Sequence, residues 1–229
     1  MEALHVERLV QAVNHELKEK SQWPKWRGGW PGRADLALLD AVYSTRQHYD
    51  TKVRPCVVEW ICKYPNPAEP ELAYLASLDP SEISATFKNT KLPGVRIPGV
   101  KGGRRKSEGV VEVANRLCRP DVNLGSAALI VDHVEQHGRD TVIALLRETK
   151  GIGPATASYF LMLLGIDGVK VDTLLRDWVL SAVGDKSLSN EGIQSLITYV
   201  ATEKFGCAVR DLDYAIWRTE SNRRRRGRR

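Results

Sequence analysis

The feature that most constrains the fold is a Gly-Ile-Gly-Pro turn at residues 151–154, between two apolar stretches. Apolar residues recur with a helical period on both sides of it, at Val142, Ile143, Leu145 and Leu146 before it and at Ala157, Phe160, Leu161 and Leu164 after it. We expect Gly151 and Gly153 to supply positive φ and to let another backbone approach, while Pro154 suits the first position of a helix. The pattern predicts two helices joined by a very tight turn. Its backbone N–H groups point outward at a helix N-terminus, which favours an anion such as phosphate.

A carboxylate follows this turn. Asp172 directly precedes a further apolar helical pattern, formed by Leu174, Leu175, Trp178, Val179 and Leu180. Aspartate at such a position is commonly a helix N-cap. The alternative is a functional carboxylate near the phosphate-binding turn, and one residue can serve both roles.

Length and composition indicate an ordinary globular protein. The 229 residues are 42% hydrophobic and 27% charged, which suits one large domain or two small ones with a core. No apolar run has the length of a membrane span, and residues 1–20 alternate charged with apolar positions, unlike a signal peptide. We therefore expect an intracellular protein of the cytoplasm and nucleoid or of the nucleus.

The positive charge is concentrated at the C-terminus. The net charge is +6, and residues 223–229 hold six arginines and one glycine; without these arginines, 28 basic residues balance 28 acidic ones. We expect residues 223–229 to form a disordered basic tail that adds salt-sensitive attraction to a polyanion. Ribosomal, membrane-surface or solubility roles would each explain such a tail too.

The rest of the chain also has helical patterns. An amphipathic stripe covers residues 2–20, and further helical patterns follow from residue 34 to residue 217 without a convincing strand pattern. A loop with Trp23, Trp26 and Trp30 separates the first two patterns. These tryptophans either stack on a nucleic-acid base or fix the loop to a core, and we favour the second interpretation. We predict an all-α protein with about ten helices.

The ordered set of landmarks resembles the helix-hairpin-helix DNA glycosylases of the endonuclease III superfamily (HhH-GPD). Their signature is a Leu-Pro-Gly-Val-Gly-like hairpin followed by Val-Asp, matched here by residues 149–153 and by Val171 and Asp172. The resemblance covers roughly residues 34–217. It implies a two-lobed all-α fold, with residues 34–165 as a helical barrel lobe that contains the hairpin 147–156. Residues 1–33, with the N-terminal helix and Trp-rich loop, and the C-terminal helices of residues 166–222 would form the second lobe. The hairpin and Asp172 would lie at the mouth of a cleft between the lobes.

The resemblance implies base excision from DNA. Breaking an N-glycosidic bond builds positive charge on the sugar, which a carboxylate stabilises, and Asp172 matches the family's catalytic aspartate. Relatives that also cleave the strand have a lysine nucleophile where this chain has Ala155. We therefore predict a monofunctional glycosylase with water as the nucleophile. Lys150 and Lys170 are the possible substitutes for that lysine, although contact with phosphate or solvent is the preferred interpretation.

The resemblance also assigns contacts with DNA. Gln47 matches a glutamine that enters the duplex where the base has left, and Arg46 flanks it. Adenine-removing relatives have a glutamate where this chain has Val42, although Asp40 lies on the same helix. The phosphate-contacting candidates are the hairpin residues Lys150, Gly151, Gly153 and Ala155 and the basic residues Arg104, Arg105 and Lys106, which follow a long turn at residues 91–103. A plain polar helix end and a solvated charged helix start are the alternatives.

The resemblance includes a monovalent cation, K⁺ or Na⁺, bound by hairpin carbonyls and bridging to phosphate. The matching carbonyls belong to Arg147, Thr149 and Ile152. The four cysteines, at positions 56, 62, 118 and 207, do not match the iron–sulfur loop of many relatives. We expect no required cofactor, no iron–sulfur cluster and no membrane partner, and a monomer that binds double-stranded DNA containing a damaged or modified base.

Two other functions stay open. A non-catalytic DNA-binding protein would explain Leu174, where a polar residue often follows the aspartate, but the intact Asp172 argues against it. A bifunctional glycosylase and AP lyase would need a relocated lysine. The base removed is not identified by the sequence, and the missing lysine and iron–sulfur loop favour alkylated bases.

Overall fold

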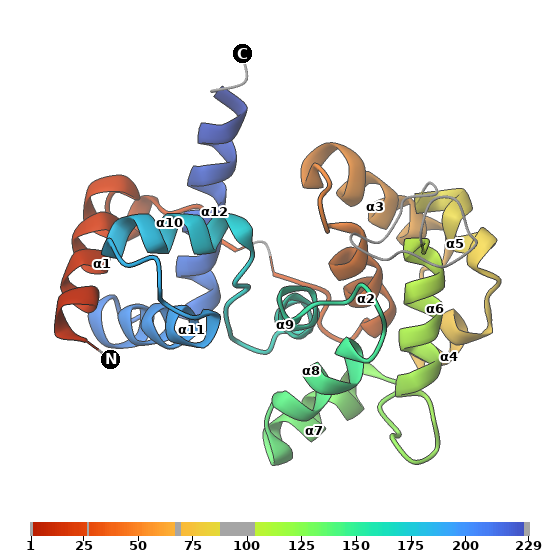
Figure 1. Cartoon of the computed structure of the whole chain (residues 1–229). Helices are drawn as coiled ribbons and strands as arrows, with labels where there is room; N and C mark the ends of the chain where they lie inside the picture. Colours follow the sequence, from red (N-terminus) through yellow and green to blue (C-terminus); the bar gives the residue numbers. More distant parts are fainter. Residues whose placement is uncertain (1, 27, 67–69, 88–103, 227–229) are drawn as a thin grey trace. The chain divides into compact units, whose positions relative to one another are not determined.

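The computed structural model describes residues 2–26, 28–66, 70–87 and 104–226, and these residues contain twelve α-helices and no β-strand. The predicted all-α fold is confirmed, with two helices more than expected. The chain forms two units, residues 28–166 and residues 1–27 with 167–229 (Figure 1). Sequence analysis placed the corresponding boundaries at residues 33/34 and 165/166. No helix within the described ranges is both long and apolar enough to cross a membrane.

Eight helices form the unit of residues 28–166: α2 (Ala34–Tyr43), α3 (Arg54–Lys63), α4 (Glu71–Ser77), α5 (Pro80–Phe87), α6 (Lys106–Leu117), α7 (Ala127–His137), α8 (Asp140–Arg147) and α9 (Pro154–Leu163). At their centre lies α2, whose ten residues are all buried. It packs against α9 and α6, and α9 is itself almost wholly buried (Figure 1). A helix that is apolar on all sides is stable only inside a core, which explains this arrangement.

Two buried aspartates of α2 have specific partners. Arg33 donates from Nε and Nη2 to the carboxylate of Asp35, both at 2.8 Å. The Asp40 Oδ2 accepts hydrogen bonds from Trp30 Nε1 at 2.9 Å and from the Tyr49 hydroxyl at 2.8 Å. Asp40 is 0% exposed, and its carboxylate connects the Trp-rich loop to α2.

The Trp-rich loop packs against protein. Trp23 is buried with its ring 5.4 Å from that of Phe205, and the Trp26 ring lies 5.4 Å from that of Tyr214. Gly29 passes so close to the end of α9 that a Cβ would lie 2.0 Å from the Leu163 carbonyl oxygen. The interpretation that these tryptophans fix the loop to a core is confirmed.

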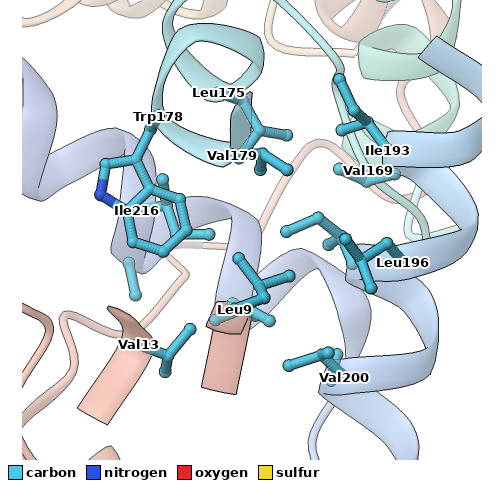
Figure 2. Packing of buried hydrophobic residues seen from close by; sticks show 14 of the residues in the cluster. Leu9, Val13, Val169, Leu175, Trp178, Val179, Ile193, Leu196, Val200 and Ile216 are labelled. Atoms are coloured by element: carbon cyan, nitrogen blue, oxygen red, sulfur yellow. The ribbon is translucent and has the colours of Figure 1, made fainter. Parts of the chain in front are cut away.

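The other unit is a four-helix cluster around its own core. It contains α1 (Ala3–Glu16), α10 (Thr173–Val183), α11 (Asn190–Tyr199) and α12 (Val209–Arg226). Figure 2 shows the buried side chains that these helices share, among them Leu9, Val13, Trp178, Leu196 and Ile216. The described residues also contain a short 3₁₀ helix, Lys20–Gln22, and two short π-helical segments, Tyr49–Val53 and Val200–Lys204.

The expectation of a disordered tail from residue 223 is wrong for its first four residues, because α12 continues to Arg226. Arg223 pairs with Glu16 at 2.6 Å and with Glu220 at 2.7 Å, and Arg224 pairs with Asp177 at 3.0 Å. Glu16 and Asp177 are distant in the sequence, so a run of arginines gave no sign of these partners. Residues 227–229 lie outside the described residues.

Candidate nucleic-acid interface and carboxylate site

The hairpin is a tight turn between α8 and α9. The Ile152 N–H donates to the Thr149 carbonyl at 3.0 Å, and Gly151 has φ of +96°, a conformation that favours glycine. Gly153 differs from the expectation, because its φ is −92° with ψ of 173°, which any residue can adopt. The sequence shows that two glycines are present but not which of them takes the left-handed conformation.

Gly153 is the N-cap residue of α9 and leaves the start of this helix open. No side chain caps the helix, and Pro154 occupies its first turn. The first N–H groups of any helix have no partner within the helix. A Cβ at Gly153 would meet nothing within 4 Å. The missing side chain therefore leaves room for a close approach to the backbone.

A charged network supports the hairpin from α6. Thr149 is buried, and its Oγ1 accepts a hydrogen bond from Arg116 at 3.1 Å. Arg116 also pairs with Glu148 and with Glu112, both at 3.3 Å, and Glu112 pairs with Arg104. Burial acts to raise the pKa of Glu112, but the hydrogen bonds from Arg104 and Thr149 and the two arginine charges hold it below its ordinary value. Arg104 was predicted to contact phosphate, and its guanidinium is committed to this network.

The predicted DNA contact of Lys106 is wrong. Lys106 is 1% exposed, and its ammonium donates to the Tyr43 carbonyl at 3.0 Å and the Thr45 carbonyl at 2.7 Å. Burial lowers its pKa to about 8. The lysine thus satisfies the carbonyl of Tyr43, the last residue of α2, and that of Thr45 in the turn that follows. A basic cluster at a helix start does not reveal which of its members turns inward. Arg105 beside it is exposed, and the preceding turn at 91–103 lies outside the described residues.

Arg46 and Gln47 lie in an exposed turn after α2. Arg46 has φ of +54°, which is uncommon for a residue with a side chain and marks a constrained turn. The Thr45 Oγ1 lies 3.5 Å from the Thr156 Oγ1 on α9. Lys106 holds the start of the same turn. The structure therefore connects this turn to both α6 and α9, all within one unit.

Asp172 is the N-cap of α10 and lies in the other unit. Its backbone is extended, with φ of −89° and ψ of 177°. Its Oδ1 accepts hydrogen bonds from the N–H groups of Leu174 at 2.9 Å and Leu175 at 3.0 Å. Both bonds of the cap use one oxygen, so Oδ2 lies outside the cap. The expected cleft with the hairpin and Asp172 at its mouth stays a prediction.

A second carboxyl group, not predicted from the sequence, acts on the same segment. Asp213 on α12 is buried, and its Oδ2 accepts a hydrogen bond from the Lys170 N–H at 3.2 Å. The pKa of Asp213 is raised to about 7, mainly by burial and further by the charge of Asp172. A signal was present, because Asp213 falls between Leu212 and Ile216 on the apolar face of a helix. An aspartate at such a position has a structural or chemical reason to be buried.

None of the described residues form a group of three or more His, Cys, Asp or Glu side chains placed to hold a metal ion. The four cysteines are free thiols, of which Cys62 is exposed. The hairpin carbonyls proposed for a monovalent cation lie within the six-residue segment 147–152, and that of Thr149 already accepts one N–H.

The fold of the whole chain is similar to that of a protein of known structure. The structure is similar to that of a Clostridium acetobutylicum 8-oxoguanine glycosylase/lyase in complex with double-stranded DNA containing cytosine opposite 8-oxoguanine. The TM-score is 0.56 at 12% sequence identity, over 97% of this chain and 71% of that chain. The fold is thus that of a DNA glycosylase-like protein.

The sequence itself defines the family. The chain belongs to the family described as domain of unknown function DUF8548, whose sequence model matches residues 7–221. No curated protein sequence matches it.

Proposed function

We propose that this protein is a DNA glycosylase that hydrolyses the N-glycosidic bond of a damaged or modified base and leaves an abasic site. One observation carries the proposal: in a DNA glycosylase-like fold, the cap of α10 uses only Oδ1 of Asp172. The carboxylate is therefore held in a fixed orientation by two backbone N–H groups while its second oxygen lies outside the cap.

The chemistry needs a fixed negative charge. As the base leaves, the deoxyribose ring becomes positively charged, and a carboxylate held close to that ring stabilises the transition state. The same carboxylate orients or deprotonates the attacking water. Asp172 would perform both tasks through Oδ2, because Oδ1 is engaged with Leu174 and Leu175.

The hairpin would hold the DNA backbone. The N–H groups of Gly151, Gly153 and Ala155 are the candidates for a phosphate, since the start of α9 has no side-chain cap. The carbonyls of Arg147, at the end of α8, and of Thr149 and Ile152 after it are hard oxygen donors, and such donors suit K⁺ or Na⁺. A bound cation would neutralise part of the phosphate charge. Gln47 and Arg46, in their exposed turn, are the candidates to fill the space left by the base.

The lysines of the hairpin region favour hydrolysis over strand cleavage. Ala155 has no nucleophile, and Lys106, whose pKa is lowered, is 1% exposed and bound to two carbonyls. Lys150 in the turn is exposed, which suits contact with phosphate or solvent. A water nucleophile is therefore the better supported mechanism.

The test is base release from a panel of end-labelled duplexes, each with one alkylated, deaminated, oxidised or mismatched base, developed with and without alkali. Asp172→Asn is the decisive variant, because asparagine caps a helix about as well as aspartate but has no charge. We expect strand breaks only after alkali, and a rate lower by roughly 100-fold or more in Asp172→Asn. Asp177→Asn, on the same helix α10, is the matched control and should behave like the wild type.

The other outcomes separate the alternatives. Breaks without alkali, together with a borohydride-trapped adduct on abasic DNA, would identify a strand-cleaving enzyme with a relocated lysine. Binding without release from any duplex would instead support a non-catalytic DNA-binding protein. We place alkylated bases first in the panel, since the chain has no lysine at position 155 and no iron–sulfur loop.

A further inference from the structure

Three aspartates fix the segment that leads from α9 to α10. Asp167 accepts hydrogen bonds from the N–H groups of Val209 and Arg210 at the start of α12, both at 3.0 Å. Asp172 caps α10 at the other end of the segment. Asp213 reaches the segment between them from α12. The segment 167–172 is thus bound at its beginning, its middle and its end.

The middle contact leads directly to Asp172. The Lys170 N–H donates to Asp213 Oδ2 at 3.2 Å, and the Lys170 carbonyl accepts the Asp172 N–H at 2.7 Å. Both main-chain polar groups of Lys170 are therefore engaged, one with Asp213 and one with Asp172. The position of the Lys170 backbone sets the direction from which the chain enters α10.

We propose that Asp213 is a positioning residue for Asp172 and acts through the main chain of Lys170. This proposal rests on the proposed function, in which Asp172 is the catalytic carboxylate. Asp213 fixes the Lys170 peptide, that peptide fixes the Asp172 N–H, and the cap on α10 then fixes the side chain. The orientation of Asp172 Oδ2 depends on all three contacts.

The surroundings of Asp213 support this role. The side chain is 6% exposed, and its helical neighbours Leu212 and Ile216 are fully buried. The charged groups that act on Asp213 are Asp172, at the start of α10, and Lys170, in the connecting segment. The negative charge of Asp172 acts to raise the pKa of Asp213. A buried carboxyl group that only filled space would be costly, whereas one that orders a functional segment has a reason to be retained.

Two substitutions test the hydrogen bond. Asp213→Asn keeps an oxygen that accepts the Lys170 N–H, and Asp213→Leu removes the acceptor while keeping the same branching at Cγ. Asp213→Ala replaces Asp213→Leu if the leucine variant does not fold. Asp211→Leu, on the same helix, is the matched control.

The first readout needs no activity. Hydrogen exchange at the amides of Lys170, Leu174 and Leu175 reports the contacts of Asp213 and the cap of Asp172. We expect exchange faster by about tenfold or more in Asp213→Leu and close to the wild type in Asp213→Asn and Asp211→Leu. Unchanged exchange of these amides in Asp213→Leu would overturn the proposal.

The second readout separates catalysis from binding. With a duplex that the wild type cuts, Asp213→Leu should lower the single-turnover rate of base release by roughly tenfold to 100-fold with an unchanged dissociation constant for DNA. Asp213→Asn should restore the rate to within about threefold of the wild type. An equal loss in both variants would overturn the positioning role. If the wild type releases no base, the proposed function fails, and the exchange experiment still decides whether Asp213 positions Asp172.

Discussion

Asp172 and Asp213 show how the surroundings of a residue set its chemistry. Asp172 is partly exposed and accepts two N–H groups at a helix start, where the helix dipole favours a negative charge. Asp213 is buried and accepts one N–H, and burial raises its pKa to about 7. Both residues are aspartates, so the residue type alone does not distinguish them. Only their surroundings make one a helix cap and the other a buried group whose pKa is raised.

The raised pKa of Asp213 predicts a pH-dependent stability. In the unfolded chain this carboxyl group loses its proton near pH 4, but in the folded protein it keeps the proton up to about pH 7. The contribution of protonated Asp213 to the free energy of unfolding is therefore fully present below about pH 4 and is lost as the pH rises through about 7. A pKa of about 7 in place of about 4 corresponds to a loss on the order of 4 kcal/mol in the free energy of unfolding.

Urea unfolding of the wild type and of Asp213→Asn at several pH values between 4 and 8 measures this effect. We expect the stability of the wild type relative to Asp213→Asn to fall as the pH rises from 4 to 8, because aspartate titrates and asparagine does not. Parallel pH profiles would show that Asp213 has an ordinary pKa in the folded protein.

At the scale of elements, the hairpin separates a glycine needed for folding from one that leaves space. Gly151 has φ of +96°, so alanine there would be strained, whereas Gly153 has φ of −92° and open space where a Cβ would lie. We expect Gly151→Ala to lower the free energy of unfolding by about 1 kcal/mol or more. Gly153→Ala should leave stability unchanged or slightly higher, by up to about 1 kcal/mol.

Gly153→Ala also tests whether the hairpin binds phosphate. We expect Gly153→Ala to weaken binding to an undamaged duplex by roughly tenfold despite its unchanged stability, since its methyl group occupies the approach to the backbone N–H groups. Fluorescence anisotropy at a fixed salt concentration measures this. Wild-type affinity in Gly153→Ala would mean that DNA does not approach the hairpin backbone.

The end of α2 depends on a lysine from another helix. Lys106 donates to two carbonyls from a fully buried position, and Lys20 donates to the carbonyls of Phe205 at 2.7 Å and Gly206 at 2.9 Å from an exposed one. We expect Lys106→Met to lower the free energy of unfolding by about 1–3 kcal/mol, because it removes a hydrogen bond from the buried Tyr43 carbonyl.

Lys20→Met is the matched control, since water can replace an exposed ammonium group, and it should cost less than about 0.5 kcal/mol. Chemical unfolding of both variants provides the comparison. Equal losses would show that burial does not distinguish the two lysines.

At the scale of the whole molecule, the positive charge of the C-terminal arginines is partly balanced by acidic residues elsewhere in the fold. The net charge is +6, and the C-terminal arginines account for it. Arg223 and Arg224 form ion pairs with Glu16 and Asp177, so part of the positive charge is balanced within the fold. Attraction to DNA would therefore depend on local groups such as the exposed Lys150 and Arg105 as well as on the tail.

The sequence by itself determined the helical class, the hairpin and the cap of α10. These features are local: a helical period, a Gly-x-Gly-Pro turn and an aspartate before an apolar helix specify their own backbone with few distant contacts. Asp172 was therefore placed correctly as an N-cap, and the loop tryptophans as packing residues.

The tertiary structure decided the roles that depend on partners distant in the chain. Lys106 turns inward because the carbonyls of Tyr43 and Thr45 lie beside it, and Arg104 pairs with Glu112 in the network behind the hairpin. The role of Asp213 depends on Lys170, which is 43 residues away in the sequence. Whether a charged side chain is buried and which groups it meets are set by packing, so its pKa and its function follow from the fold and not from the local pattern.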